Sequence, residues 1–387
     1  MRVKLKDIFD LQMGKTPSRS NLEYWNTTDY KWISIADLTK TSKYIFETKE
    51  YLSKSAIKDS GIKVIPANTV VMSFKLSIGK TAITKEDMYS NEAIMAFKDK
   101  HVINIIPEYI FYLFKYKNWE EGSNKAVMGK TLNKATLSEI EVEICSIEKQ
   151  RQIVNILDKI MSAVDGRKQE LQLLDELIKA RFVEMFGDPV SNPYGYDKVA
   201  LSDLADIKIG PFGSLLHKED YIDGGHPLLN PSHIVDGKVS PDDKLTISDE
   251  KYEELSAYQL KTGDVVMGRR GEMGRCAVVP EDGFLCGTGS MLIRTKGEVT
   301  ADYIQKIISF PSFKKTIEDM AVGQTMPNLN VPIVSGFQII KPPMEVQDRY
   351  YAFAEQVNKS KFDTMTFAPI YAIINLYLHT YFYQGRR

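Results

Sequence analysis

Basic and amide side chains recur in loops of both halves of the sequence. An arginine guanidinium can form two hydrogen bonds with the major-groove edge of guanine, asparagine and glutamine can do the same with adenine, and lysine binds phosphate oxygens. Such residues, set among glycine, serine and threonine, predict a surface that binds DNA. The candidates are Lys15, Thr16, Lys75, Ser77, Lys80, Lys130 and Asn133 in the first half, and Phe212, Ser214, Arg269, Arg270, Arg275, Gln324, Asn328 and Asn330 in the second.

Each of these residues also has a simpler explanation, because an exposed lysine or arginine is usually just solvated surface. The neighbouring Gly79 and Gly274 favour turns more than close approach to a ligand. The prediction of DNA binding therefore depends on the whole set and on its repetition.

The sequence has no evident catalytic centre or metal site. Gly-Lys-Thr occurs at residues 14–16, 79–81 and 129–131, but the first glycine of a phosphate-binding P-loop is missing each time. Asn192-Pro-Tyr-Gly lacks the second proline of a methyltransferase adenine pocket, and Pro241-Asp-Asp-Lys lacks the spacing of a nuclease site, so both favour turns. The five histidines and three cysteines have no metal-ligand spacing. We therefore expect no catalytic residue, metal ligand or cofactor in the chain.

The second half of the chain repeats the first. The run that begins at Val265, Val-Val-Met-Gly-Arg-Arg-Gly-Glu-Met-Gly-Arg, aligns without gaps with the run that begins at Val70, Val-Val-Met-Ser-Phe-Lys-Leu-Ser-Ile-Gly-Lys. Glu345-Val-Gln likewise corresponds to Glu148-Lys-Gln, and each opens a helical stretch. A period of about half the chain indicates two copies of one large unit, a globular domain followed by a long helix.

The centre of the chain, residues 147–187, has the pattern of one long helix. Apolar residues follow each other at alternating steps of four and three, which is the seam of a coiled coil. Gly187 and the Asp-Pro pair after it end this pattern, and Gly166 is its weak point. The residues expected to pair this helix with a C-terminal one, or to dock partners, are Ile153, Leu157, Ile160, Val164, Leu171, Leu174, Ile178, Met185, Val346, Tyr350, Phe353 and Val357.

The remaining pattern predicts an α+β fold. Residues 31–35, 70–74 and 92–97 have the composition of short strands, and residues 107–117 have that of a helix. We expect two tandem α/β domains, at residues 1–146 and 188–342. Each is followed by a long helix, at 147–187 and 343–387, and the helices pair as an antiparallel coiled coil. Such a chain has a pseudo-two-fold axis, like a symmetric dimer made from one polypeptide.

Composition and charge fit a cytoplasmic protein. Three cysteines without a disulfide pattern favour a reducing compartment. Residues 366–383 are uncharged, but Pro369, Asn375, His379 and several tyrosines favour a buried helix over a membrane span. Residues 1–146 carry 22 basic and 18 acidic side chains, whereas residues 188–341 carry 16 and 22. A DNA surface must therefore be local, made by selected loops.

The order of these motifs resembles the specificity subunit of type I restriction–modification systems. The resemblance rests on the helix start Glu148-Lys-Gln-Arg-Gln-Ile-Val-Asn-Ile-Leu-Asp, on the link Phe186-Gly-Asp-Pro, and on Gly263-Asp-Val-Val-Met-Gly-Arg-Arg-Gly and Gln324-Thr-Met-Pro-Asn-Leu-Asn. It covers essentially the whole chain. Beyond Phe362, the apolar tract with Pro369 departs from the charged heptads of that family.

The resemblance implies a non-catalytic subunit. Each globular unit would be a target-recognition domain that reads one half of a bipartite sequence in double-stranded DNA. The paired helices would fix the gap between the halves and dock two adenine-methyltransferase subunits, and translocase–nuclease subunits would join the full complex. S-adenosylmethionine, ATP and Mg²⁺ would belong to those partners. No membrane partner is expected.

Two other functions remain open on the sequence alone. The chain could itself be a methyltransferase or nuclease of unusual sequence, which the absent motifs disfavour. It could instead be a helical scaffold whose domains bind protein and which lacks sequence-specific DNA binding. Exchange of Arg269, Arg270 and Arg275 for alanine without loss of DNA binding would favour the scaffold.

Overall fold

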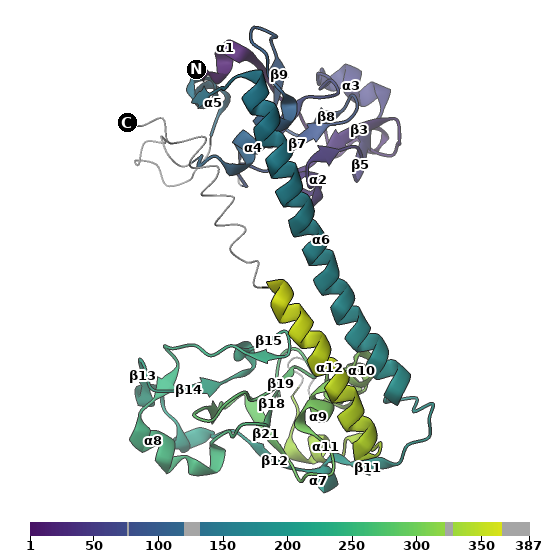
Figure 1. Cartoon of the computed structure of the whole chain (residues 1–387), viewed down its shortest axis with the longest axis vertical. Coiled ribbons are helices and arrows are strands. Elements are labelled where there is room, and N and C mark those ends of the chain that lie inside the picture. The colour runs from purple at the N-terminus through teal and green to yellow at the C-terminus, as the bar shows by residue number, and fades with distance from the viewer. Residues whose placement is uncertain (76, 120–131, 322–327, 366–387) are drawn as a thin grey trace. The chain divides into compact units, whose positions relative to one another are not determined.

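The computed structural model describes residues 1–75, 77–119, 132–321 and 328–365 (Figure 1). The chain divides into two compact units, of which the first contains Met1–Gln169 and the second contains Glu170–Thr364. Each unit holds a globular domain and part of a long helix. Among the described residues, no helix is long and apolar enough to span a bilayer. The uncharged tract at 366–383 lies outside them.

The main sheet of the first domain is buried on both faces. Val70 and Met72 face one apolar core and Val71 faces another, because side chains alternate across a strand. An unbroken apolar run is expected for such a strand. Among the described residues, the strand order is β2 (Phe9–Met13), β9 (Ile94–Asp99), β6 (Val70–Ser73), β7 (Thr81–Thr84) and β4 (Tyr44–Ile45), antiparallel except for the pair β7 and β4. Helix α4 (Pro107–Tyr116) covers the face of Val70 and Met72.

Smaller elements complete the first domain. A second sheet has the order β5 (Glu50–Leu52), β3 (Tyr30–Ile33) and β8 (Tyr89–Ser90), and β1 (Arg2–Lys4) pairs with β10 (Glu141–Glu143). The short helices are α1 (Leu5–Ile8), η1 (Leu22–Tyr24), α2 (Ile35–Lys40), α3 (Lys54–Ser60) and α5 (Lys134–Glu139). The predicted strands at 31–35, 70–74 and 92–97 and the helix at 107–117 are confirmed, with ends that differ by one or two residues.

The second domain is built on the same plan. Its described main sheet has the order β12 (Ala205–Ile209), β21 (Ser290–Thr295), β18 (Val265–Gly268) and β19 (Cys276–Val278), all antiparallel. A second sheet has the order β13 (Tyr221–Ile222), β17 (Thr246–Ile247), β14 (His226–Leu229) and β20 (Leu285–Cys286). The strand pairs β11 (Lys198–Ala200) with β22 (Gln338–Ile340), and β15 (Ile234–Val235) with β16 (Lys238–Val239), lie beside them. The helices are α7 (Leu201–Leu204), η2 (Gly213–Leu215), η3 (Lys218–Asp220), η4 (Pro231–His233), α8 (Asp249–Glu254), η5 (Ser256–Tyr258), α9 (Ala301–Ile308), α10 (Pro311–Met320) and α11 (Val331–Ser335).

The two sheets correspond strand by strand. The order β2, β9, β6, β7 in the first domain matches β12, β21, β18, β19 in the second, and the ladder of β1 with β10 matches that of β11 with β22. The internal repeat and the α+β class predicted from the sequence are confirmed.

Two long helices follow the domains. Helix α6 (Ile147–Phe186) is continuous and is capped by Gly187, whose φ is 74° and whose N–H donates to the Val183 carbonyl at 2.8 Å. Helix α12 (Met344–Met365) is the described part of the expected C-terminal helix. The N-terminal part of α6 packs into the first domain, where Ile153 and Leu157 are buried.

In the second unit, α12 lies antiparallel to the C-terminal part of α6 (Figure 1). Ring centroids of Phe186 and Tyr350 are 5.4 Å apart, the guanidinium of Arg181 lies 5.5 Å from the Phe353 ring, and Lys361 forms an ion pair with Asp175. In these contacting pairs, the residue number decreases along α6 while it increases along α12. The two helices therefore run antiparallel, as predicted. Of the expected seam residues in this unit, Ile178, Tyr350 and Val357 are buried, and Leu171, Leu174, Met185, Val346 and Phe353 are partly buried. In the first unit, Val164 is buried and Ile160 is partly buried.

Candidate nucleic-acid interface

The polar loops of the first domain meet at one edge of its main sheet. Met13 ends β2 and pairs with Met95 near the start of β9, and Ser73 ends β6 and pairs with Ile94. Because these neighbours are antiparallel, the loop after β2, the loop before β9 and the loop between β6 and β7 lie together. Lys15, Thr16, Lys75, Ser77 and Lys80 belong to these loops.

The second domain brings its loops together in the same way. Ile209 ends β12 opposite Met291, and Gly268 ends β18 opposite Ser290. The loop after β12 lies against the loop before β21, so closely that a Cβ on Gly210 would be 2.1 Å from the Gly287 carbonyl oxygen. We call these segments, residues 14–20, 74–75, 77–80 and 91–93 of the first domain and 210–216, 269–275 and 287–289 of the second, the sheet-edge loops. The repeat therefore places two equivalent polar edges in one chain.

In the first domain, the predicted residues are held by different contacts. Lys15 is exposed and its Nζ donates to the Ser60 carbonyl at 2.5 Å. The Thr16 hydroxyl donates to the Glu92 carboxylate, and this bond is the main cause of the lowered pKa of Glu92. The Lys75 ammonium lies 5.4 Å from the centroid of the Phe74 ring. The side chains of Ser77 and Lys80 are exposed. This edge therefore presents lysine side chains around one ionised carboxylate.

Arg19 is a sheet-edge residue that sequence reasoning missed. Its guanidinium lies 3.8 Å from the Trp25 ring centroid and 5.0 Å from that of Trp32, and it forms an ion pair with Glu50. The Trp32 indole N–H donates to the Lys15 carbonyl at 3.0 Å. The available signal was a single arginine in a serine-rich loop, followed by two nearby tryptophans that could stack against it.

In the second domain, the structure brings Arg269, Arg270 and Asn328 together. Arg269 Nε donates to Asn328 Oδ1 at 3.2 Å, and Arg270 and Asn328 form an isolated antiparallel β-bridge. Burial and the neighbouring positive charge of Arg270 lower the pKa of Arg269. The Arg270 side chain is exposed, and none of the described residues forms an ion pair with it. Two guanidinium groups and one amide, the types that read guanine and adenine, thus share one site.

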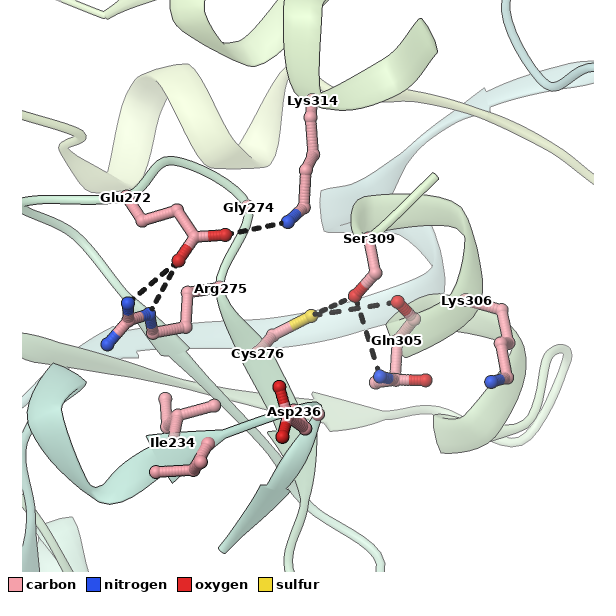
Figure 2. A pocket seen from close by; sticks show the side chains of 12 residues that line it. Ile234, Asp236, Glu272, Gly274, Arg275, Cys276, Gln305, Lys306, Ser309 and Lys314 are labelled. Carbon is pink, nitrogen blue, oxygen red and sulfur yellow. Dashed lines mark hydrogen bonds and ion pairs between the residues drawn. The ribbon is translucent and has the colours of Figure 1, made fainter. Parts of the chain in front are cut away.

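Arg275 has a different environment, because Glu272 binds it (Figure 2). Glu272 Oε2 accepts from Arg275 Nη2 at 2.7 Å, and Oε1 accepts from Lys314 Nζ on α10 at 3.0 Å. Arg275 Nη1 also donates to the Pro231 carbonyl at 3.2 Å. The two cations lower the pKa of Glu272, so this carboxylate stays ionised at neutral pH. Glu272 therefore holds the loop between β18 and β19 against α10.

A cavity of about 470 Å³ lies beside this contact (Figure 2). Lys306, Lys314 and Arg275 line it together with Asp236 and Glu272, so its positive charges are largely balanced. The Cys276 thiol is buried at its wall, and burial raises the pKa of this thiol to about 11. A thiol in this state is not a reactive nucleophile at neutral pH.

Several predicted residues lie elsewhere or have another role. Asn133 Oδ1 accepts from the Thr136 N–H at 2.9 Å and Asn330 Oδ1 accepts from the Ile333 N–H at 3.0 Å, so each caps the helix that follows. The cap uses one of the two lone pairs of each amide oxygen and fixes its direction toward the start of the helix. The Phe212 ring is 62% exposed, and Ser214 lies in η2. Lys130 and Gln324 lie outside the described residues.

Metal ligands do not gather in the described part of the chain, where no three His, Cys, Asp or Glu side chains could hold a metal ion together. What the geometry offers is hydrogen-bond donors and cations at two equivalent, solvent-facing edges. Such an arrangement suits a binding protein with two related surfaces.

A sequence profile of the family described as "Type I restriction modification DNA specificity domain" matches residues 1–176 and 193–369, and the chain belongs to this family. It is thus a specificity subunit with two DNA-recognition domains and is not itself the catalytic subunit. The resemblance expected from the sequence is confirmed.

Individual relatives agree with this assignment. The type I restriction enzyme MjaIX specificity subunit of Methanocaldococcus jannaschii is 25% identical over 383 residues, which cover 91% of this chain and 85% of the relative. The EcoR124I/EcoR124II specificity subunit of Escherichia coli is 26% identical over 171 residues, or 41% of each chain.

Two solved structures share the fold. The type I restriction–modification S subunit from M. genitalium superposes with a TM-score of 0.56 at 12% identity and covers 99% of this chain and 96% of its own. A chain from a study of complex assembly and conformational transition of the type I R-M system has a TM-score of 0.64 at 17% identity, with 97% and 95% covered.

Proposed function

We propose that each domain reads one half of a bipartite sequence in double-stranded DNA through its sheet-edge loops, and that α6 and α12 set the gap between the halves. The observation that carries the proposal is the repetition of one polar sheet edge in two domains that are joined by a continuous helix. A single reading surface would need no second copy. Two copies on one helix suit a target with two specified parts.

The side chains at the two edges support different kinds of contact. Lys15, Lys75 and Lys80 suit phosphate oxygens, which position a protein on the duplex without reading sequence. Arg269 and Arg270 suit guanine edges, and the Asn328 amide beside them suits adenine. Since residues 188–341 carry an excess of acidic side chains, we infer that the second domain depends more on base contacts and less on phosphate contacts than the first.

The long helices have an apolar stripe available for a partner. Leu173 is 61% exposed and Leu177 is 46% exposed, and the exposed Ala180 continues the same face of α6. The seam residues Leu174 and Ile178 lie about 100° further around the helix and point into the core with α12. We infer that this stripe docks an adenine-methyltransferase subunit, and that a second copy docks elsewhere on the helices.

The complete complex would also include translocase–nuclease subunits and act in the cytoplasm. S-adenosylmethionine, ATP and Mg²⁺ would be bound by the partners, where methyl transfer and DNA cleavage take place. This chain would select the DNA sequence at which the partners act.

Methylation mapping tests the proposal. The chain is expressed with the methyltransferase encoded beside it in a host without adenine methylation, and N6-methyladenine is located by single-molecule sequencing. We expect one split motif, two short specified halves around a fixed gap. Methylation without sequence preference, from a complex that is shown to assemble, would contradict the proposal and favour a helical scaffold.

A further inference from the structure

A buried glutamine joins the first domain to the start of its long helix. Gln150, in the first turn of α6, is fully buried. Its Oε1 accepts from the backbone N–H of Ile106, the N-cap residue of α4, at 2.9 Å. Its Nε2 donates to the carbonyls of Asn104 and Cys145, both at 3.0 Å. One side chain therefore connects the start of α4, the segment that leaves the domain, and the long helix.

The second domain contains the same joint. Gln347, in the first turn of α12, is also fully buried. Its Oε1 accepts from the backbone N–H of Thr300, the N-cap residue of α9, at 3.2 Å, and its Nε2 donates to the Pro342 carbonyl at 3.0 Å. Cys145 and Pro342 each lie five residues before their glutamine. The polar geometry of the joint is thus conserved between the two halves of one chain.

A buried tyrosine accompanies each glutamine. Tyr109 of α4 donates its hydroxyl hydrogen to the Glu143 carbonyl at 2.9 Å, and Tyr303 of α9 donates to the Ile340 carbonyl at 2.8 Å. Glu143 ends β10 and Ile340 ends β22, the strands by which the chain leaves each domain. The exit strand and the domain helix are therefore tied together directly beside the glutamine.

Apolar packing alone would not fix such a joint as narrowly. Hydrophobic contact is largely non-directional, whereas an amide that donates and accepts in one plane defines both distance and angle. Loss of the amide would leave buried backbone groups without partners, which is costly. The joint therefore has one favoured geometry.

We propose that Gln150 and Gln347 are positioning residues that set the orientation of each recognition domain on its own helix, and that they thereby determine which gap length between the two half-sites is accepted. The inference rests on the proposed function, because gap length has meaning only for a bipartite target. Neither glutamine is expected to touch DNA. Their effect reaches the target through the domains that they hold.

The test uses the full chain in complex with its methyltransferase. DNA substrates carry the two mapped half-sites with the natural gap or with a gap one base pair shorter or longer, and the initial methylation rate is measured on each. We expect Gln150→Ala and Gln347→Ala to lower the preference for the natural gap roughly tenfold. The bases that are required within each half-site should stay the same.

Matched controls come from exposed glutamines on the same helices. Gln152 of α6 and Gln356 of α12 are exposed, and Gln152→Ala and Gln356→Ala should keep the gap preference of the unchanged chain. Stability is measured in parallel by thermal unfolding of every complex. An alanine variant of Gln150 or Gln347 that is less stable and yet keeps the full gap preference would assign these residues a purely structural role and overturn the inference.

A conservative variant covers the case in which the alanine variants do not assemble. In Gln347→Glu, a protonated carboxyl group can accept and donate as the amide does, but the ionised form repels the Pro342 carbonyl. Burial raises the pKa of a carboxyl group, so we expect the gap preference of this variant to be near normal at pH 6 and reduced at pH 8. A preference that does not change with pH would contradict the positioning role. Absence of a split motif for the unchanged chain would instead contradict the proposed function.

Discussion

Arg270 is the exposed guanidinium of the loop between β18 and β19, and Arg269 and Asn328 lie beside it. We expect Arg270→Ala to weaken binding by about 1–3 kcal/mol and to relax the base preference at one position of the second half-site only. The measurement is competitive binding of the assembled complex to a panel of single-base variants. Lys315→Ala, at an exposed position on α10, is the matched control and should change neither quantity.

Replacement of Glu272 distinguishes two roles for this carboxylate, because one role predicts stronger DNA binding and the other predicts weaker discrimination. If this carboxylate only adds negative charge near DNA, Glu272→Gln should strengthen binding, because DNA repels acidic groups. If it holds the loop through Arg275 and Lys314, the same change should weaken discrimination at the second half-site several-fold. We expect weakening. Glu318→Gln, at an exposed acidic position of α10, removes the same charge without touching the loop.

The pH dependence of this contact has a definite sign. The bonds from Arg275 and Lys314 lower the folded-state pKa of Glu272 below the ordinary value of a glutamate. Its contribution to stability is therefore complete above the unfolded pKa and is lost as the pH falls through the lower folded pKa. Half-site discrimination that depends on Glu272 should be constant between about pH 6 and 8, as binding at each pH would show.

For single residues, the sequence predicted which side chains gather at the sheet-edge loops better than it predicted the contacts that these side chains make. Arg269, Arg270 and Asn328 were expected at one surface, and they are close together. The capping role of Asn133 and Asn330 was not foreseen, although asparagine before a helix commonly caps it. Arg275 was predicted to contact DNA, but its guanidinium binds Glu272, three positions earlier in the chain. Lys314, which binds the same carboxylate, is on a helix 39 positions after Arg275, and single-sequence patterns do not contain such distant contacts.

The packing of α6 against α12 forms part of the hydrophobic core of the second unit. Phe182 contacts Phe186, Tyr303, Phe310 and Tyr350, and its side chain is only 3% exposed. Phe182→Ala should lower the free energy of unfolding by about 3–5 kcal/mol, because the cavity cannot close easily. Val183→Ala, at a position that is 45% exposed, should change it by less than about 0.5 kcal/mol. Urea unfolding followed by circular dichroism compares the two.

The exposed stripe on α6 makes a separate prediction. Leu173→Ser together with Leu177→Ser should leave folding nearly unchanged, because both side chains are largely in water. The double variant should bind the methyltransferase at least tenfold more weakly if the stripe is buried on docking. Lys179→Ser, at an exposed position on another face of α6, is the control. Calorimetric titration measures each affinity, and an unchanged affinity of the double variant would place the docking site elsewhere.

The extent of α6 could be predicted, but its full buried surface could not. The heptad seam identified Ile178 and Leu174 correctly, since these residues face α12 and the core. Phe182 and Phe186 lie outside that seam and are nevertheless buried. The reason is that α6 packs against α12 and against Tyr303 of the second domain at once, so a wider arc of the helix is covered than one partner helix requires.

At the scale of the whole molecule, α6 contributes residues to both compact units, and Gly166 is the weakest helix former in it. A Cβ at this position would meet no atom within 4 Å, so Gly166→Ala should stabilise the helix by about 0.5–1 kcal/mol. We expect a higher Tm and a sharper gap preference. Gly187→Ala is the opposing control, because φ is 74° there and a Cβ would lie 2.5 Å from Pro193 Cγ; it should lower the Tm.

The repeat also has a consequence for direction along DNA. The two sheet edges are equivalent in backbone but not in side chains, since Phe74 and Lys75 of one occupy the positions of Arg269 and Arg270 in the other. Two identical readers would fit a duplex equally well in either direction. Two domains with the same backbone but different sheet-edge side chains would accept the DNA in one direction only. The two ends of the bound DNA would then be distinguishable. On the proposed function, each partner that assembles on this chain would bind in an order fixed by that polarity.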